Sequence, residues 1–240
     1  MHYLLPPAGS YALLLAVGLA VSALAFWRSQ RRQPELGVVF LGGLCGAFIG
    51  AKIAYLFAEG FLDWQQPDRW VRFATGKSII GGLLGGYAGV EWVKHLCGIR
   101  RPTGDAFALA CPLGLILGRI GCCLHGCCGG IILEHGGGHW RWPAPQAEAG
   151  SLLGMLLVFH LLHRRRLLQH RLFFVFLIAY GGFRFVHEWL RETPKWWGWL
   201  SGYQILCLVM AAAGWRGLVR RTREMRRVIS LSGAPPERSQ

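Results

Sequence analysis

Residues 118–128 read GRIGCCLHGCC, a stretch that places an arginine inside an apolar run and then cysteines and a histidine at the end of that run. A charged side chain at bilayer depth costs at least ~2.5–3.5 kcal/mol on insertion scales, so Arg119 needs a partner or a function. A second arginine, Arg184, lies in an equally apolar run near the other end of the chain. Two buried cations that face one cavity predict a site for an anionic lipid headgroup.

The composition of the whole chain is that of a membrane protein. Of its 240 residues, 53% are hydrophobic and only 16% are charged, whereas a soluble domain carries about 25% charge. The net charge of +14 would suit a nucleic-acid-binding protein. The basic residues, however, cluster in short loops between apolar runs, which is the topology signal of membrane proteins. We therefore expect a multi-pass membrane protein that binds no nucleic acid.

Seven apolar segments predict the transmembrane helices, because continuous runs without period-two alternation favour helices over barrel strands. They cover residues 11–27, 36–58, 78–97, 105–124, 149–163, 171–190 and 199–218. Basic residues concentrate in the first, third and fifth loops and after the last segment. The positive-inside rule then places the N-terminus outside and the C-terminus in the cytoplasm. We expect an all-α bundle over residues 1–220 and a basic, disordered cytoplasmic tail over residues 221–240.

In this orientation, polar residues of several segments converge near the outer leaflet. They are Lys52, Arg119, Glu148, Arg184 and Glu188. Tyr180, Arg184, Glu188 and Arg191 follow at i, i+4, i+8 and i+11, which is one face of a helix. Glu188 could pair with Arg184 as a purely structural ion pair. Arg119, however, leaves an excess of positive charge, which an anionic ligand would neutralise, and planar guanidinium groups suit phosphate.

Small residues mark the third and fourth segments. Glycines stand at positions 81, 82, 85, 86, 114, 118 and 121. Such spacing is typical of close helix packing in membranes. A backbone that a lipid headgroup can approach is the alternative interpretation, above all at Gly81, Gly82 and Gly121.

The cysteine-rich end of the fourth segment allows three interpretations. An oxidising compartment would permit disulfides among Cys122, Cys123, Cys127 and Cys128. Cys122, Cys127 and His125 could instead contribute to a metal site, although the spacing is only a loose signal for one. Third, the positive charge of Arg119 would make a nearby thiol nucleophilic, so that Cys122 or Cys127 could carry a covalent lipid intermediate. His125 and His187 are candidate proton acceptors, because histidine titrates near neutral pH; His187 neighbours Glu188 and need not face the cavity, so His125 is the stronger candidate.

At these residues the chain resembles the prolipoprotein diacylglyceryl transferase family. The match is carried by GRIG at 118–121 with the His125-Gly126 turn, YGGFRFVHEWLR at 180–191, PAPQAE at 143–148 and GGLLG at 81–85. The resemblance implies a seven-helix enzyme of the bacterial inner membrane that uses no cofactor. It implies transfer of a diacylglyceryl group from phosphatidylglycerol to the cysteine thiol of a prolipoprotein, with release of glycerol phosphate.

The resemblance also implies roles for single residues. Arg119 and Arg184 would hold the phosphate and stabilise the charge of the leaving group, while Glu188 would orient Arg184. Glu148 would support the outer end of the cavity. The lipid-binding surface would be completed by Lys52, Gly81, Gly82, Gly121 and Tyr180.

Four positions depart from the family pattern. Ile80 stands where the family has a histidine, Cys122 where it has an asparagine, Cys127 where it has a glutamate and Ala147 where it has a tyrosine. These changes remove polar groups near the reacting centre. Two alternatives therefore stay open: a related lipid transferase with another acceptor, and a thiol or metal membrane protein on the same fold.

Overall fold

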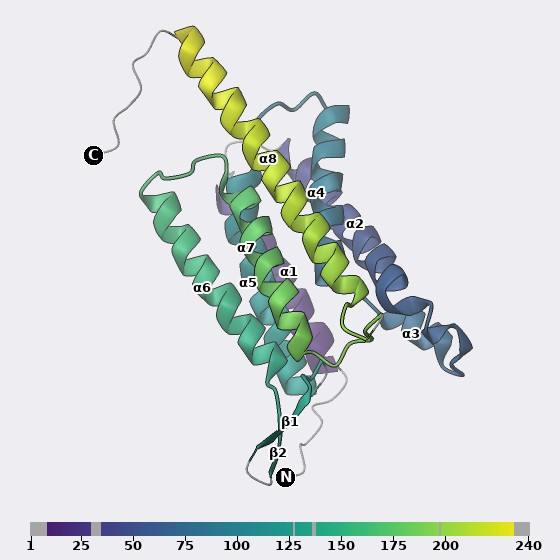
Figure 1. Cartoon of the computed structure of the whole chain (residues 1–240). Coiled ribbons are helices and arrows are strands. Elements are labelled where there is room, and N and C mark those ends of the chain that lie inside the picture. The colour runs from purple at the N-terminus through teal and green to yellow at the C-terminus, as the bar shows by residue number, and fades with distance from the viewer. Residues whose placement is uncertain (1–8, 30–34, 127, 136–137, 197, 233–240) are drawn as a thin grey trace.

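The computed structural model describes residues 9–29, 35–126, 128–135, 138–196 and 198–232. Within these ranges seven long helices form an elongated bundle (Figure 1). They are α1 (Gly9–Ser29), α2 (Leu36–Tyr55), α4 (Ile79–Leu96), α5 (Gly104–His125), α6 (Ala144–Arg164), α7 (Leu172–His187) and α8 (Gly202–Ser232). The all-α prediction is therefore confirmed for the bundle.

Five helical stretches are long and apolar enough to cross a membrane. They are Leu36–Gly60, Gly104–His125, Ala144–Arg164, Leu172–Leu190 and Gly202–Arg227. Among the described residues, α1 contributes a shorter apolar stretch, Ala12–Arg28, and α4 does not reach the same measure. The membrane character of the chain is confirmed, whereas the count of seven spans stays a prediction.

Glycines bring α2 and α4 into close contact. A Cβ atom added at Gly85 would lie 2.2 Å from the carbonyl oxygen of Gly46, and one added at Gly81 would lie 2.3 Å from that of Gly50. A Cβ atom could not be accommodated this close to the opposite backbone. The two helices approach each other closely because both have glycine there, which is the packing expected of small residues in membrane helices. The packing interpretation of these glycines is therefore confirmed.

The helix α7 lies at the centre of the core. Its aromatic residues Phe173, Phe176 and Tyr180 are buried among residues of α5, α6 and α8. Large hydrophobic side chains on other faces, such as Phe48 and Leu157, are exposed in the isolated chain. Since a bilayer would cover such residues, the outward apolar faces agree with a membrane setting.

Short elements close the end of the bundle at which α7 finishes and α8 begins. The turns η1 (Leu56–Gly60) and η2 (Asp63–Gln65) lead from α2 into α3 (Arg69–Thr75), and η3 (Glu188–Leu190) continues α7. A hairpin of β1 (Ile132–His135) and β2 (Gly138–Arg141) pairs Ile132 with Arg141 in antiparallel register. Its base is tied to η3, because the backbone N–H of Ile131 donates to the carbonyl oxygen of Leu190 at 3.0 Å.

The tail differs from the sequence prediction. Helix α8 continues to Ser232, so residues 221–232 are helical rather than disordered. Arginine has a high helix propensity, and Glu224 pairs with Arg221 at 3.0 Å and with Arg220 at 3.9 Å, one helical turn away. Such pairs support a helix even where its sequence is highly charged. Residues 233–240 lie outside the described part of the chain.

Candidate functional site

A buried cluster of charged residues forms where α5 ends, α6 begins and α7 passes into η3. Its members are Arg119, Glu148, Tyr180, Arg184, Glu188 and Arg191, which we call the arginine cluster. The two glutamates and Tyr180 are fully buried, and the side chains of the arginines are between 5% and 11% exposed. Burial of this many charges requires that they neutralise one another closely.

Glu148 is the centre of the arginine cluster. Its Oε1 lies 2.9 Å from Nη2 of Arg119 and accepts a hydrogen bond from the Tyr180 hydroxyl at 2.5 Å. Its Oε2 lies 3.6 Å from Nη1 of Arg184 and 3.5 Å from Nη1 of Arg191. One carboxylate therefore connects three guanidinium groups from two separate parts of the chain.

Glu188 forms the second anionic centre. Its Oε2 lies 3.0 Å from Nη2 of Arg184 and 3.6 Å from Nε of Arg191, while the Thr193 hydroxyl donates to Oε1 at 2.7 Å. The predicted partnership of Arg184 and Glu188 is confirmed. Burial lowers the pKa of the Lys195 ammonium, which donates to the Glu188 carbonyl oxygen at 2.6 Å and to Thr193 Oγ1 at 2.9 Å.

The arginine cluster carries an excess of positive charge. Three guanidinium groups share two carboxylates, a formal excess of one positive charge. Lys195 and Glu59 interact with the same groups from the edge of the cluster and add one charge of each sign, so the formal excess stays at one. Within the described residues, Nε of Arg119 and of Arg184 has neither a hydrogen bond nor an ion pair. Nη1 of Arg184 and of Arg191 and Nε of Arg191 face carboxylate oxygens at 3.5–3.6 Å without a hydrogen bond. Buried donors without an acceptor are costly. An oxygen-rich anion such as a phosphate would supply both the missing charge and the missing acceptors.

His187, the second candidate proton acceptor, lies beside the cluster. The Nε2 atom of His187 accepts a hydrogen bond from the indole Nε1 of Trp142 at 3.1 Å, and its ring stacks on Phe183 with centroids 5.0 Å apart. Since an indole can only donate, Nε2 of His187 carries no proton and the ring is the neutral Nδ1–H tautomer. Nδ1 is buried and makes no hydrogen bond with the described residues.

Several contributors were missed because their positions in sequence gave little sign of them. Arg191 was predicted to share the face of Tyr180 and Arg184, but not to bind the same carboxylates. Thr193 and Lys195 follow the helical segment, where periodicity no longer predicts which way a side chain points. Trp142 lies between β2 and α6, just before the 143–148 motif. Its partner His187 is 45 residues further along the chain.

Three predicted ligand-binding residues have other contacts. The ammonium of Lys52 donates to the carbonyl oxygens of Phe73, Ala74 and Gly76 at 2.5, 2.7 and 2.9 Å. Its three donors therefore fix the C-terminal end of α3 and are not directed at the arginine cluster. Gly81 packs against Gly50 and Ala54 of α2, while Gly82 faces Ala47 and Ala51 at ordinary contact distance.

The cysteine-rich turn lies next to the arginine cluster. The Sγ atom of Cys122 is 4.0 Å from Nη1 of Arg119, and the buried Gly121 precedes it. The structure shows no disulfide among Cys122, Cys123 and Cys128. Cys127 lies outside the described residues. In the described part of the chain, no three His, Cys, Asp or Glu side chains gather as metal ligands would.

His125 occupies the end of α5. It is half-buried and precedes Gly126, which closes the helix in the left-handed conformation at φ 68°. Six residues separate it from Arg119, which is about 9 Å along a helix axis. His125 therefore lies at the C-terminal end of α5, beyond Arg119, rather than among the cations.

Comparison with known proteins agrees with this geometry. The family model described as prolipoprotein diacylglyceryl transferase matches residues 6–220. A protein of Methylococcus capsulatus is 31% identical over 229 residues, which are 85% of this chain and 87% of the relative. A protein of Geobacter sulfurreducens is 32% identical over 213 residues, 80% and 81% of the two chains. A protein of Zymomonas mobilis is 31% identical over 203 residues, 75% and 70% of the two. All three bear the name phosphatidylglycerol–prolipoprotein diacylglyceryl transferase.

Proposed function

This chain belongs to the prolipoprotein diacylglyceryl transferase family, and on that premise we propose that it transfers a diacylglyceryl group from phosphatidylglycerol to the cysteine thiol of a prolipoprotein. The observation that carries this proposal is the uncompensated positive charge of the buried arginine cluster. The headgroup phosphate of phosphatidylglycerol has the charge and the acceptor oxygens that the cluster lacks. The names of the relatives supply the two substrates.

In the proposed reaction a thiolate sulfur attacks the carbon of the diacylglyceryl group that is bonded to the phosphate oxygen. A carbon–sulfur bond forms, the carbon–oxygen bond to the phosphate breaks, and glycerol phosphate leaves with the electron pair. Negative charge therefore grows on a phosphate oxygen during the step. Arg119, Arg184 and Arg191 stabilise that charge from fixed positions, because Glu148 and Glu188 hold the guanidinium groups before the substrate arrives.

The thiol proton needs an acceptor. Ile80 offers none, because its side chain is a hydrocarbon, and it is buried among apolar side chains. Nε2 of His187 already accepts a hydrogen bond from the Trp142 indole N–H. We assign the proton to His125, which is half-buried at the outer end of α5. The Sγ atom of Cys122 lies 4.0 Å from Nη1 of Arg119. Of the two thiols predicted to carry a covalent intermediate, Cys122 and Cys127, it is the one that the structure describes.

The membrane arrangement is part of the proposal. Seven long helices and basic loops on alternate sides support seven spans, with the N-terminus outside and the C-terminus in the cytoplasm. In that arrangement the arginine cluster lies toward the outer leaflet of a bacterial inner membrane. A lipid of that leaflet could reach the cluster from the side, and a prolipoprotein could reach it from outside.

The test uses purified full-length protein, radiolabelled phosphatidylglycerol and a lipobox peptide. The proposal expects lipidated peptide and glycerol phosphate in equal amounts, both lost in Arg119→Gln and Arg184→Gln. Arg141→Gln is the matched control, because this exposed arginine pairs with the surface residue Glu192 and donates to the Gly130 carbonyl oxygen, and neither contact is with the arginine cluster. Glycerol phosphate without lipidated peptide would indicate another acceptor, and no product from the wild type would reject the transferase.

Two further variants separate the steps within the site. Cys122→Ala keeps full turnover if the acceptor thiol attacks the lipid directly, and loses it if Cys122 carries an intermediate. His125→Gln lowers the rate of peptide lipidation but leaves phosphatidylglycerol binding unchanged if His125 takes the proton. An unchanged rate would remove His125 from the mechanism.

A further inference from the structure

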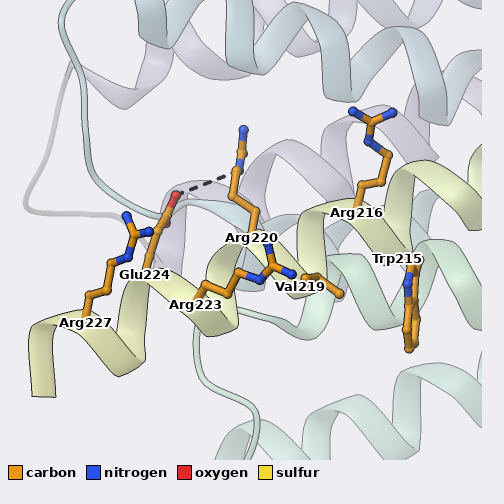
Figure 2. A pocket seen from close by; sticks show the side chains of 7 residues that line it. All are labelled: Trp215, Arg216, Val219, Arg220, Arg223, Glu224 and Arg227. Carbon is orange, nitrogen blue, oxygen red and sulfur yellow. Dashed lines mark ion pairs between the residues drawn. The ribbon is translucent and has the colours of Figure 1, made fainter. Parts of the chain in front are cut away.

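A basic cleft lies on α8, far from the arginine cluster. It has a volume of about 440 Å³ and is lined by Trp215, Arg216, Val219, Arg220, Arg223, Glu224 and Arg227 (Figure 2). The four arginines follow at i, i+4, i+7 and i+11, so they form one stripe along the helix. Figure 2 shows these side chains on successive turns, with Arg220 directed at Glu224.

Most of the positive charge in this basic cleft is not paired. Arg220 is held between Glu91 of α4 at 3.6 Å and Glu224 at 3.9 Å. Glu224 also pairs with Arg221, outside the cleft, at 3.0 Å. Within the described residues, no ion pair involves Arg216, Arg223 or Arg227. The basic cleft therefore offers three exposed guanidinium groups to an anion.

The basic cleft and the arginine cluster lie at opposite ends of the bundle. Gln204, near the start of α8, donates to the carbonyl oxygen of Phe185 at 3.3 Å, next to the arginine cluster. Arg216 and Arg227 follow 12 and 23 residues later, which is about 18 and 35 Å along the helix. The hydrocarbon core of a bilayer is about 30 Å thick. Figure 1 shows this end of α8 extending past the level of the α6–α7 connection, at the end of the bundle away from the β1–β2 hairpin.

We propose that the basic cleft binds the headgroup of an anionic phospholipid in the leaflet opposite to the arginine cluster. A guanidinium group can donate two parallel hydrogen bonds to a phosphate. The three unpaired arginines carry more positive charge than a single phosphate group needs for neutralisation. The exposed indole of Trp215 stands at the membrane end of the stripe, where an amphipathic ring packs against the glycerol and upper acyl chains. This lipid would be bound and not consumed, because the reacting groups are at the other end of the bundle.

The probe is phosphatidylserine, an anionic lipid that the proposed transfer does not use, with phosphatidylcholine as the neutral comparison. Native mass spectrometry of the detergent-solubilised full chain would count bound lipids during a titration. The test variant is the triple change Arg216→Gln, Arg223→Gln and Arg227→Gln. The matched control neutralises three exposed arginines at the same end of the bundle, Arg164, Arg165 and Arg166. Both triple variants lose the same charge.

We expect the wild type to bind phosphatidylserine more tightly than phosphatidylcholine. Each basic residue near an anionic lipid surface contributes about fivefold to binding, so the test variant should lose about 100-fold in phosphatidylserine affinity. The control should stay within about threefold of the wild type. Equal losses in the two triple variants, or none in the test variant, would overturn the proposal. Displacement of the lipid by excess inorganic phosphate would overturn it too, since that is the behaviour of a small-anion site.

The result is independent of the proposed transfer reaction. The test variant should keep its phosphatidylglycerol turnover, because no residue of the basic cleft belongs to the arginine cluster. Conversely, Arg119→Gln should leave phosphatidylserine binding to the basic cleft unchanged. If phosphatidylserine binding is lost in Arg119→Gln and kept in the test variant, the lipid occupies the arginine cluster and the basic cleft is not a lipid site.

Discussion

Replacing Glu148 by glutamine should destabilise the protein strongly. The side chain keeps its shape and loses its charge, so three buried guanidinium groups would be left with the single carboxylate of Glu188. Glu148 contacts Arg119 at 2.9 Å, Arg184 at 3.6 Å and Arg191 at 3.5 Å, and it is fully buried. Removing one partner from a buried ionic network costs about 3–5 kcal/mol. For a chain of this size that free energy lowers the melting temperature by about 6–20 °C.

The assay is thermal unfolding in detergent without added lipid, with Glu192→Gln as the matched control. That glutamate also pairs with an arginine, Arg141, but both side chains are more than half exposed, at 62% and 54%. Exposed pairs contribute about 0–1 kcal/mol, so the control should lose no more than about 4 °C. Equal melting temperatures for the two variants would refute the view that Glu148 neutralises the arginine cluster.

A double variant separates charge balance from lost packing. Arg191→Gln added to Glu148→Gln removes one of the three cations, so it should recover part of the loss. Residues that share a network show non-additive changes in unfolding free energy of about 0.5–3 kcal/mol. A double variant whose loss equals the sum of the single losses would show that the two side chains are energetically independent.

Three further outcomes are expected. Arg119→Lys keeps the charge but not the planar guanidinium group, so it should lose one charge-assisted hydrogen bond of ~1.5–3 kcal/mol. Phosphatidylglycerol turnover should then fall by about 10- to 200-fold, and near-normal turnover would mean that charge alone suffices. Gly85→Val should lower the unfolding free energy by ~1–3 kcal/mol or more, because its Cβ would lie 2.2 Å from the Gly46 carbonyl oxygen, whereas Gly182→Val, with no atom within 4 Å, should lower it less. Trp142→Phe removes the hydrogen-bond donor to Nε2 of His187, so the ¹⁵N NMR signals of the His187 ring should lose the pattern of a fixed Nδ1–H tautomer. Unchanged signals would show that another group sets the tautomer.

The pattern of apolar runs and charges was enough to predict the bundle. Each long helix lies on one of the predicted segments, because every backbone group of a membrane helix must be satisfied within its own segment. The ends of the helices were less predictable. Helix α8 continues past the apolar run to Ser232 because ion pairs on its surface, which hydropathy does not record, support a charged helix.

The contacts of the arginine cluster were predicted from the sequence only where both residues lie on one helix. Tyr180, Arg184 and Glu188 share a face by helical spacing alone. The structure pairs Arg184 with Glu188 as expected, whereas the Tyr180 hydroxyl donates to Glu148 of another helix. Lys52 was expected at the same level of the membrane and is there used to cap α3 instead. Depth in the bilayer follows from sequence position, but direction around the helix axis depends on which neighbour the side chain meets.

The sequence by itself determined that this chain is an all-helical membrane protein with arginines at bilayer depth, since burying such charges has so large a cost that their presence implies a purpose. Only the tertiary structure decided how those charges are balanced. Glu148 reaches Arg119 and Arg184 from another helix, across 29 and 36 positions of the chain, and Arg191 joins them from beyond the end of α7. Side-chain ion pairs between helices depend on packing and rotation, which no single segment encodes. The sequence predicted an excess of positive charge, but which carboxylates balance the arginines became visible only in the tertiary structure.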